Sequence, residues 1–363
     1  MSEILVVTWD GGGNVPPALG ISAELQARGH HVRFLGHRGQ AAAFAEAGVP
    51  FEAFSRARRF SSDEPSGTST LMGVFADRKM GQDVVDSLAR QPADVVLVDC
   101  LLFGVMDALR RSGREYAVLE HSFDGYFRRA AHGPLGLLLR LRGCRPLSLL
   151  DAGHPVLAAT LDELDAGAGP VEHTGPVLAD PPSGATPPPA APAVLLSLST
   201  FAFRSLVPTW QRVLDAVDGL PARVVATTGP AVDPALLRIP AKVEHHRWLP
   251  HADVLPEVSL VVGHGGHATT MAALAHDRPL VILPLDPKTD QPFVGRAVRA
   301  AGAGRTLSRR SSAVDIRRAI EDLLGEGPHR QAAARLGAKI RATPGAALAA
   351  DRIEALPSAR PTG

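Results

Sequence analysis

The segment at residues 261–274, VVGHGGHATTMAAL, places a histidine and two glycines between a β-branched run and a helical pattern. Glycines let a backbone approach a ligand closely, and the start of a helix offers unpaired N–H groups and the positive end of its dipole. Threonine hydroxyls in the first helical turn add further donors. The segment therefore predicts a clamp for a diphosphate, formed by His264, Gly265, Gly266, Thr269 and Thr270.

The same residues have two other interpretations. The glycines could form only a tight turn, with His264 as an incidental polar residue. A metal-ligand role for His264 is weaker, because the position four residues later is Ala268, which offers no second ligand.

Short apolar runs rich in β-branched residues alternate with helical patterns along the chain. This rhythm predicts parallel strands connected by helices, and so an α/β fold. The predicted strands lie at residues 3–9, 31–36, 51–54, 94–99 and 116–121 in the first half, and at 193–199, 222–228, 242–248, 260–263 and 280–285 in the second.

Residues 179–193, ADPPSGATPPPAAPA, interrupt this rhythm. Such a density of proline cannot pack as helix or sheet and is typical of a semi-rigid spacer. A chain of 363 residues also exceeds what one hydrophobic core usually supports. We therefore expect two α/β domains, each with its ligand site at the carboxyl ends of its strands, where His264 lies.

The composition excludes several classes of partner. A net charge of +1 and 21% charged residues give no field that would attract nucleic acid or an anionic membrane, so we expect a small-molecule ligand. The two cysteines, Cys100 and Cys144, predict neither a disulfide framework nor a cysteine-rich metal site. No basic leader and no apolar stretch of ~20 residues is present, so we expect a soluble, cytoplasmic protein.

Residues 247–292 carry many polar and glycine positions at fixed spacings. Their series resembles the donor-binding signature of the UDP/TDP-sugar-dependent glycosyltransferases with the GT-B fold, which include plant natural-product and actinobacterial antibiotic glycosyltransferases. The residues that carry the resemblance are Trp248, Pro250, Val254, Leu255, His264, Gly265, Gly266, Thr269, Thr270, Pro279, Pro284, Asp290 and Gln291.

The resemblance implies two Rossmann-like domains whose parallel sheets face each other across an interdomain cleft. Residues 1–178 would then form the acceptor-binding domain, and residues 194–345 the nucleotide-sugar-binding domain after the linker at 179–193. The last segment, 346–363, would be a helix and tail that return to the first domain.

Each donor-site residue has a role implied by the resemblance. Trp248, with Leu249 beside it, would border the nucleotide base, and His264 would donate a hydrogen bond to a phosphate oxygen. The glycines and threonines of the clamp would add donors around that phosphate. The remaining residues are Asp290 and Gln291, for the sugar hydroxyls, and Ser199 and Thr200, in a second phosphate-side loop.

Alternatives to these roles stay open. Trp248 could be a core residue, Asp290 and Gln291 a solvated turn, and Ser199 and Thr200 a helix cap. Two departures from the family pattern also bear on the contacts to the donor sugar and ribose. Ala272 stands where plant relatives hold the ribose with an acid, and the stretch from Pro284 to Asp290 contains two extra residues, which leaves Asp286 as a rival for the sugar contact.

A third departure concerns the chemistry. Relatives commonly carry a basic histidine in the loop after the first strand, and Asn14 occupies that position here. A neutral amide cannot accept a proton, yet a transfer with inversion needs a base for the acceptor hydroxyl. Our candidates are residues at strand ends, Asp10 first and then Asp99 and His121. The alternative is that the two acids cap helices and that His121 has a structural hydrogen bond.

The sequence thus predicts an inverting, metal-independent glycosyltransferase with no cofactor besides its nucleotide-sugar donor. We expect a deoxysugar from a TDP donor, although UDP stays open, and a lipophilic acceptor that is phenolic or a polyketide, joined through oxygen or carbon. The sequence leaves a homodimer open. The rival predictions are a sugar-nucleotide epimerase of similar fold and a non-catalytic sugar-nucleotide-binding or activator protein.

Overall fold

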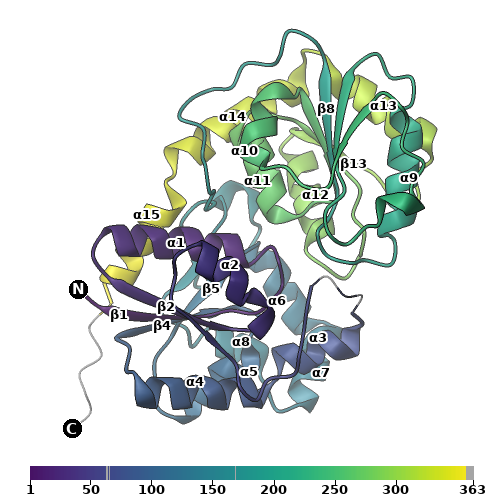
Figure 1. Cartoon of the computed structure of the whole chain (residues 1–363). Helices are drawn as coiled ribbons and strands as arrows, with labels where there is room; N and C mark the ends of the chain where they lie inside the picture. Colours follow the sequence, from purple (N-terminus) through teal and green to yellow (C-terminus); the bar gives the residue numbers. More distant parts are fainter. Residues whose placement is uncertain (63, 65, 168, 357–363) are drawn as a thin grey trace. The chain divides into compact units, whose positions relative to one another are not determined.

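The computed structural model describes residues 1–62, 64, 66–167 and 169–356. It divides the chain into two compact units (Figure 1). The first unit contains Met1–Ser61, Ser66–Ala179 and the segment that begins at Pro344, and the second contains Asp180–Thr343. The predicted tail after residue 356 lies outside the described residues.

The first unit is built on a seven-stranded sheet with the order β3-β2-β1-β4-β5-β6-β7. All neighbouring strands in it are parallel, as the sequence predicts. The two strands at one edge are short and were not predicted. The strands are β1 (Glu3–Val7), β2 (His31–Gly36), β3 (Phe51–Ala53), β4 (Val95–Asp99), β5 (Ala117–Glu120), β6 (Val156–Ala158) and β7 (Glu172–His173).

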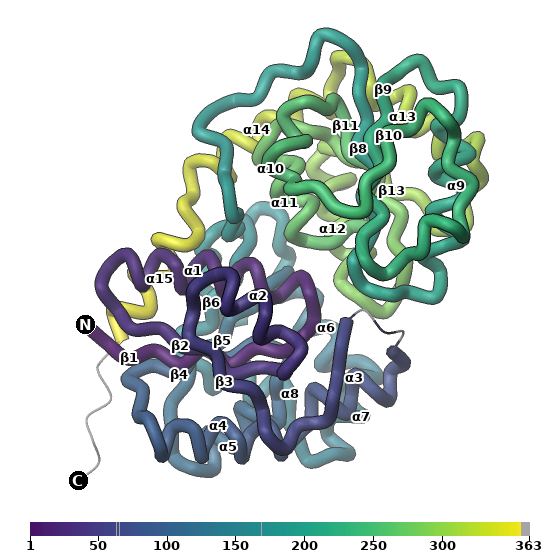
Figure 2. The backbone as a smooth tube through the Cα atoms, in the orientation of Figure 1, coloured from purple at the N-terminus to yellow at the C-terminus, as the bar shows by residue number. Residues whose placement is uncertain are grey.

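Helices cover this sheet, and one of them comes from the far end of the sequence. α15 packs against α1, as the tube in Figure 2 shows, and Arg28 at the end of α1 pairs with Asp351 and Glu354 of α15 at 2.6 and 2.7 Å. The helices are α1 (Val15–Ala27), α2 (Ala41–Glu46), α3 (Thr68–Phe75), α4 (Arg78–Arg90), α5 (Phe103–Arg111), α6 (Asp124–His132), α7 (Pro134–Leu141), α8 (Pro146–Leu150) and α15 (Gly345–Glu354).

The second unit has a six-stranded parallel sheet with the order β10-β9-β8-β11-β12-β13. Its strands are β8 (Ala193–Ser197), β9 (Arg223–Thr227), β10 (Val243–His246), β11 (Leu260–Gly263), β12 (Leu280–Ile282) and β13 (Gly304–Thr306). Its helices are α9 (Leu206–Val217), α10 (His251–Val254), α11 (His267–Ala275), α12 (Gln291–Ala300), α13 (Ala313–Leu324) and α14 (Pro328–Ala342). None of the helices in the described ranges combines the length and apolar composition that a membrane crossing requires.

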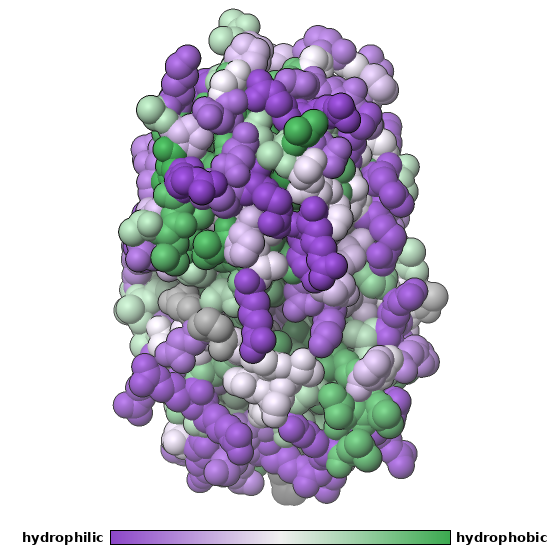
Figure 3. Space-filling view, turned by 90° about the vertical axis from the view of Figure 1, so that its right-hand side faces the viewer, coloured by the Kyte–Doolittle hydropathy of each residue, from purple (hydrophilic) through white to green (hydrophobic). Residues whose placement is uncertain are grey.

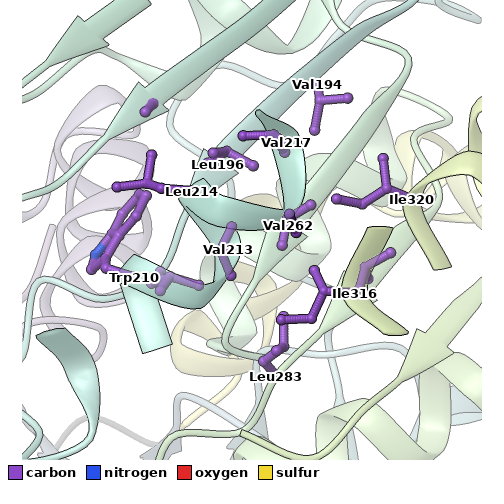
Figure 4. Close-up of a cluster of buried hydrophobic side chains, with 14 of the residues drawn as sticks. Val194, Leu196, Trp210, Val213, Leu214, Val217, Val262, Leu283, Ile316 and Ile320 are labelled. Atoms are coloured by element: carbon purple, nitrogen blue, oxygen red, sulfur yellow. The ribbon is translucent and has the colours of Figure 1, made fainter. Parts of the chain in front are cut away.

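The core of the second unit fixes the two strands that carry the predicted clamp. Trp210 of α9 is fully buried and packs with Leu214 over the sheet, next to Leu196 of β8 (Figure 4). Val262 of β11 and Ile316 of α13 belong to the same cluster. Since β8 and β11 are neighbours in this packed layer, the loops that follow them start from a rigid base.

The proline-rich linker is attached to the second unit. The backbone N–H of Thr186 donates to Asp277 at 2.9 Å, and the guanidinium of Arg278 donates to the carbonyl of Pro187 at 3.0 Å. Arg278 is fully buried, and this burial lowers its pKa to about 10. The middle of the spacer is therefore fixed to the unit that follows it.

Candidate active site

Each sheet has one place where the order of its strands reverses. The chain runs outward in opposite directions from β1 and β4 in the first unit, and from β8 and β11 in the second. The loops after such a pair diverge and leave a crevice at their carboxyl ends, which is where ligands bind in open α/β sheets. We call these places the first switch point, after β1 and β4, and the second switch point, after β8 and β11.

Asp99, the last residue of β4, is the centre of the first switch point. Its Oδ1 accepts hydrogen bonds from Trp9 Nε1 at 3.1 Å and from the backbone N–H of Leu101 at 3.0 Å. Its Oδ2 accepts one from Asn14 Nδ2 at 3.0 Å and lies 3.1 Å from Nδ1 of His121. The carboxylate is buried, and these contacts fix its orientation.

His121 follows β5, the strand next to β4, and so reaches the same edge of the sheet. Its ring makes an edge contact with Phe127, with the centroids 5.4 Å apart. Because Nδ1 faces Asp99, Nε2 lies on the opposite side of the ring. A carboxylate that orients an imidazole in this way is the arrangement that supports a general base. Two of the three predicted catalytic residues, Asp99 and His121, therefore meet.

Asp10 has different neighbours. The expectation that it ends the first strand is wrong, because β1 ends at Val7 and Asp10 stands three residues further on. Its backbone N–H donates to Nδ1 of His37 at 3.2 Å. His37 is buried, and this burial lowers its pKa to about 4. Asp10 thus lies in a loop whose backbone is held by a hydrogen bond to His37.

Asn14, which stands where relatives carry the basic histidine, lies beside Asp99. Its Nδ2 also donates to Thr8 Oγ1 at 3.0 Å and to the carbonyl of Trp9 at 3.1 Å. Gly11 is required nearby, because a Cβ there would lie 2.6 Å from the ring of Trp9. The absence of a side chain at this position leaves room for the indole.

At the second switch point, both glycines after His264 face the protein's own atoms. A Cβ on Gly266 would lie 2.6 Å from the imidazole of His264. Gly265 has a φ of +86°, and a Cβ there would lie 2.9 Å from the carbonyl of Gln291 and from Ile282. The glycines therefore make room for the histidine ring and for the start of α12, while the predicted close approach of their backbone to a ligand stays a prediction.

The ring of His264 is partly buried, and this burial lowers its pKa to about 4 against a smaller opposite effect of the Leu198 carbonyl. At neutral pH the ring is uncharged and carries one N–H donor. Its Nδ1 has no hydrogen-bond partner among the residues that the structure describes. The one N–H of the neutral ring can donate either to the Leu198 carbonyl or to an anionic oxygen next to the start of α11, so a phosphate contact through Nδ1 requires the tautomer with its proton on that atom.

The two threonines of the clamp differ. Thr270 is buried, and its hydroxyl donates to the carbonyl of Gly266 at 2.8 Å inside α11. That hydroxyl hydrogen is already used, in contrast to its predicted role as a ligand donor. Thr269 lies in the first turn and is partly exposed. The N–H groups of this turn remain as donors for an anion.

The loop after β8 lies at the same switch point. Ser199 is buried, and its Oγ accepts a hydrogen bond from the backbone N–H of Phe201 at 3.0 Å, while Thr200 is exposed. The helix-cap alternative is wrong, because α9 begins at Leu206, well after this pair. The rings of Phe203 and His264 lie 6.5 Å apart, which links the loops after β8 and β11.

Trp248 follows β10 by two residues and is 68% exposed. Its exposure excludes the alternative that it is a core residue, and an open indole face is suited to stacking on a base. Leu249 beside it is partly buried.

Asp290 and Gln291 lie at the start of α12. Gln291 is buried, and its Oε1 accepts hydrogen bonds from the backbone N–H groups of Leu285, at 2.6 Å, and Asp286, at 3.2 Å. Its carbonyl oxygen is thus used to hold the preceding loop, which leaves the side-chain NH₂ as its donor for a sugar. Asp290, the residue before the helix, is partly exposed.

Sequence reasoning missed two residues of the first switch point. Trp9 was included in a predicted strand, although its indole holds Asp99. His37 was not singled out, although it supports the loop of Asp10. The available signal was position, because each follows the end of a parallel strand.

Known proteins resemble this chain in sequence. The family model of the erythromycin biosynthesis protein CIII-like C-terminal domain matches residues 211–356. The chain is 29% identical to 4'-demethylrebeccamycin synthase of Lentzea aerocolonigenes, over 98% of this chain and 99% of that protein. It is 32% identical to L-demethylnoviosyl transferase of Streptomyces niveus, over 46% of this chain and 45% of that protein.

Solved structures share the whole fold. The glycotransferase of kitacinnamycin matches with a TM-score of 0.78 and 22% identity, over 97% of this chain and 98% of that one. A spinosyn rhamnosyltransferase complexed with thymidine diphosphate matches with a TM-score of 0.74 and 20% identity, over 98% of this chain and 100% of that one. At such identities the likeness shows the fold alone. The chain thus has a GT-B fold, is similar over almost its whole length to an antibiotic-forming synthase, and is a glycosyltransferase.

Proposed function

We propose that this enzyme transfers a deoxysugar from a TDP donor to a hydrophobic natural-product acceptor with inversion at the anomeric carbon, and that His121 is the base. The observation that carries the proposal is the 3.1 Å contact between Asp99 Oδ2 and His121 Nδ1 at the first switch point. It supplies an oriented imidazole where Asn14 replaces the usual histidine.

In this mechanism Nε2 of His121 accepts the proton of the acceptor hydroxyl while that oxygen attacks the anomeric carbon. The bond from the anomeric carbon to the diphosphate oxygen breaks at the same time, and its electron pair leaves with the diphosphate. Asp99 keeps Nδ1 protonated and stabilises the imidazolium that forms. With a phenolic acceptor the same base could serve attack through oxygen or through the ortho carbon, because the phenol ionises more readily than an alcohol.

The structure favours His121 over Asp10, which the sequence ranked first. The Asp10 loop is organised around His37, whereas His121 has the carboxylate partner that a base requires. A buried carboxylate such as Asp99 that already accepts three hydrogen bonds is suited to orient the base and not to act as one.

We assign the leaving diphosphate to the second switch point. The donors there would be His264 and the N–H groups at the start of α11, with Trp248 stacked on the base. Withdrawal of charge from the breaking bond by these donors would favour departure of the nucleotide. The choice of TDP is supported by the structural neighbour that holds thymidine diphosphate, and the deoxysugar by the demethylnoviosyl transferase relative.

The hydrophobic acceptor is supported by α7. This helix exposes Leu137, Leu138 and Leu141, which are 54%, 39% and 76% accessible. Exposed leucines on consecutive turns of one helix are an unusual surface unless a ligand or partner covers them. Figure 3 looks onto the side of the molecule where Figure 1 labels α3 and α7, and clusters of hydrophobic side chains lie there among hydrophilic ones.

The test is a product analysis. The enzyme is incubated with TDP- and UDP-linked hexoses and deoxyhexoses of known anomeric configuration and a panel of phenolic, enolic and alcoholic aromatic acceptors. We expect transfer from a TDP deoxysugar, with an anomeric coupling constant in the product that shows inversion. Retained configuration would overturn the mechanism, and release of free sugar with no glycoside from any acceptor would overturn the transfer itself.

A further inference from the structure

Three different kinds of metal-ligating atom converge beside the proposed base. A carboxylate oxygen of Asp99, Sγ of Cys100 and a ring nitrogen of His121 all lie within 4.8 Å of one another. Cys100 directly follows Asp99 at the end of β4, and its backbone N–H bonds to the carbonyl of Leu119 on β5 at 3.1 Å. The two strands therefore hold the three side chains on a rigid frame. The proton transfer proposed above gives Cys100 no role.

The spacing of these atoms fits a tetrahedral ion. Nδ1 of His121 lies 3.1 Å from Oδ2 of Asp99 and 3.7 Å from Sγ of Cys100. An ion bound to nitrogen, oxygen and sulfur at about 2.0–2.3 Å separates tetrahedral ligand atoms by about 3.3–3.7 Å. In these two pairs the ligand atoms would have to move by only a few tenths of an ångström, and the atoms of Asp99 and Cys100 lie within 4.8 Å of each other. One sulfur, one nitrogen and one oxygen are a donor set for Zn²⁺, whereas Mg²⁺ and Ca²⁺ require oxygen ligands.

The surroundings of the cluster also suit an ion. Oδ1 of Asp99 is held by Trp9 and by the N–H of Leu101, which are the outer contacts that orient a metal-binding carboxylate. Burial, with the nearby carboxylates of Asp99 and Glu120, raises the pKa of the Cys100 thiol well above its usual range. This shift opposes metal binding, because cysteine binds a metal as the thiolate and the ion would have to displace the thiol proton. The side chain of His121 is 15% exposed and gives the cluster an edge toward solvent.

We propose that Asp99, Cys100 and His121 form an inhibitory Zn²⁺ site. The ion binds the three atoms, and the thiol proton passes to solvent. The neutral imidazole has a single N–H proton, which leaves Nδ1 when the metal binds there and is replaced, by exchange through solvent, with one on Nε2. With its proton on Nε2, the ring can no longer accept one from the acceptor. The inhibition rests on the function proposed above, whereas the ion site itself does not.

The site is tested first without any activity measurement. One equivalent of Co²⁺ is added to the reduced, metal-free full-length protein, and the thiolate-to-cobalt charge-transfer absorption is recorded. The chain has only two cysteines, both buried, so Cys144→Ser is the matched control for Cys100→Ser. We expect the absorption in the wild type and in Cys144→Ser, and its loss in Cys100→Ser. Cys100→Ala replaces Cys100→Ser if the latter does not fold.

Inhibition is measured next with Zn²⁺ itself, with each protein's rate normalised to its own metal-free rate. We expect Zn²⁺ to inhibit the wild type and Cys144→Ser reversibly on addition of a chelator. Changes in the outer contacts of a metal site typically weaken metal affinity by about 10–100-fold. Cys100→Ser removes a ligand itself, so the Zn²⁺ concentration needed for inhibition should rise by at least that factor. Equal amounts of Mg²⁺ should have no effect.

Three results would overturn the site: no charge-transfer absorption in folded wild type, the same absorption in Cys100→Ser, or its loss in Cys144→Ser. Cobalt binding without zinc inhibition would keep the site and overturn its inhibitory role. An enzyme that is inactive with every acceptor but shows the cobalt pattern would count against the proposed function alone.

Discussion

The two switch points have the same topology but differ in whether their polar side chains are hydrogen-bonded within the protein. At the first, the carboxylate of Asp99 is buried and bonded to Trp9 and Asn14 within the unit. At the second, His264 has a nitrogen with no partner in the described part of the chain, and Trp248 is 68% exposed. Under the function proposed above, the paired carboxylate orients the base, whereas the unpaired nitrogen and the exposed indole contact the nucleotide. One fold would then supply a proton-transfer site and a nucleotide site.

The largest effect should come from the proposed base. We expect His121→Gln to lower kcat by about 10²–10⁴, because an amide cannot accept the acceptor's proton. The matched control is Asp10→Asn, which should change kcat by no more than about threefold if the Asp10 carboxylate takes no part in the proton transfer. The measurement is the steady-state kcat of both variants with the acceptor found in the product screen. A reversed order of the two variants would return the base to Asp10 and remove the contrast between the switch points.

A second prediction concerns acid stability of the first unit. The pKa of His37 is about 4 in the folded chain, below about 6.5 in an unfolded one. Between these values the unfolded chain binds a proton that the folded chain does not, so stability falls as pH falls from 6.5 to 4. His37 contributes about 3 kcal/mol to this loss.

His37→Gln should remove that contribution while its side-chain oxygen still accepts from the N–H of Asp10. Hydrogen exchange of peptides from the first unit, followed between pH 7 and 4, reports the stability of that unit separately from the second. An unchanged acid dependence in His37→Gln would show that His37 is not the group that responds.

Glycine substitutions separate the fold of the second switch point from its ligand contact. Gly265→Ala should cost about 1–3 kcal/mol of stability, because φ is positive and the added Cβ meets the backbone of Gln291. Gly266→Ala has an ordinary φ of −64°, and its nearest contact is the ring of His264, so it should displace that ring and weaken TDP binding at a smaller cost in stability than Gly265→Ala. Gly13→Ala, where a Cβ meets nothing within 4 Å, is the neutral control. Thermal unfolding and TDP titration of all three variants measure the two effects separately. Equal losses of stability in Gly265→Ala and Gly266→Ala would contradict the distinction.

The smallest effect should come from Trp248. Since its ring is mostly exposed, Trp248→Ala should leave stability within about 0.5 kcal/mol of the wild type. Loss of stacking on the base should weaken TDP about tenfold, whereas Trp248→Phe should restore part of the affinity. Equal affinity of all three proteins would place the base elsewhere.

The parallel sheets were predictable because buried parallel strands are continuous β-branched runs. Strands β6, β7 and β13 were missed, since segments of two or three residues carry too little pattern. The strand-end rule correctly brought Asp99 and His121 to one edge. The same rule could not show that Asp10 is a weaker candidate base than His121. That difference depends on contacts between side chains that are far apart in the sequence. The reason for the glycines at 265 and 266 was equally out of reach, since only the folded chain shows which atoms face them.

The division of labour between the switch points is tested most directly by calorimetric titration of TDP into the wild type, His264→Ala and His121→Gln. We expect His264→Ala to weaken binding by about tenfold or more, through loss of a phosphate contact, and His121→Gln to bind TDP as the wild type does. Equal weakening in both variants, or unchanged binding in His264→Ala, would contradict the assignment of the nucleotide to the second switch point and the proton to the first.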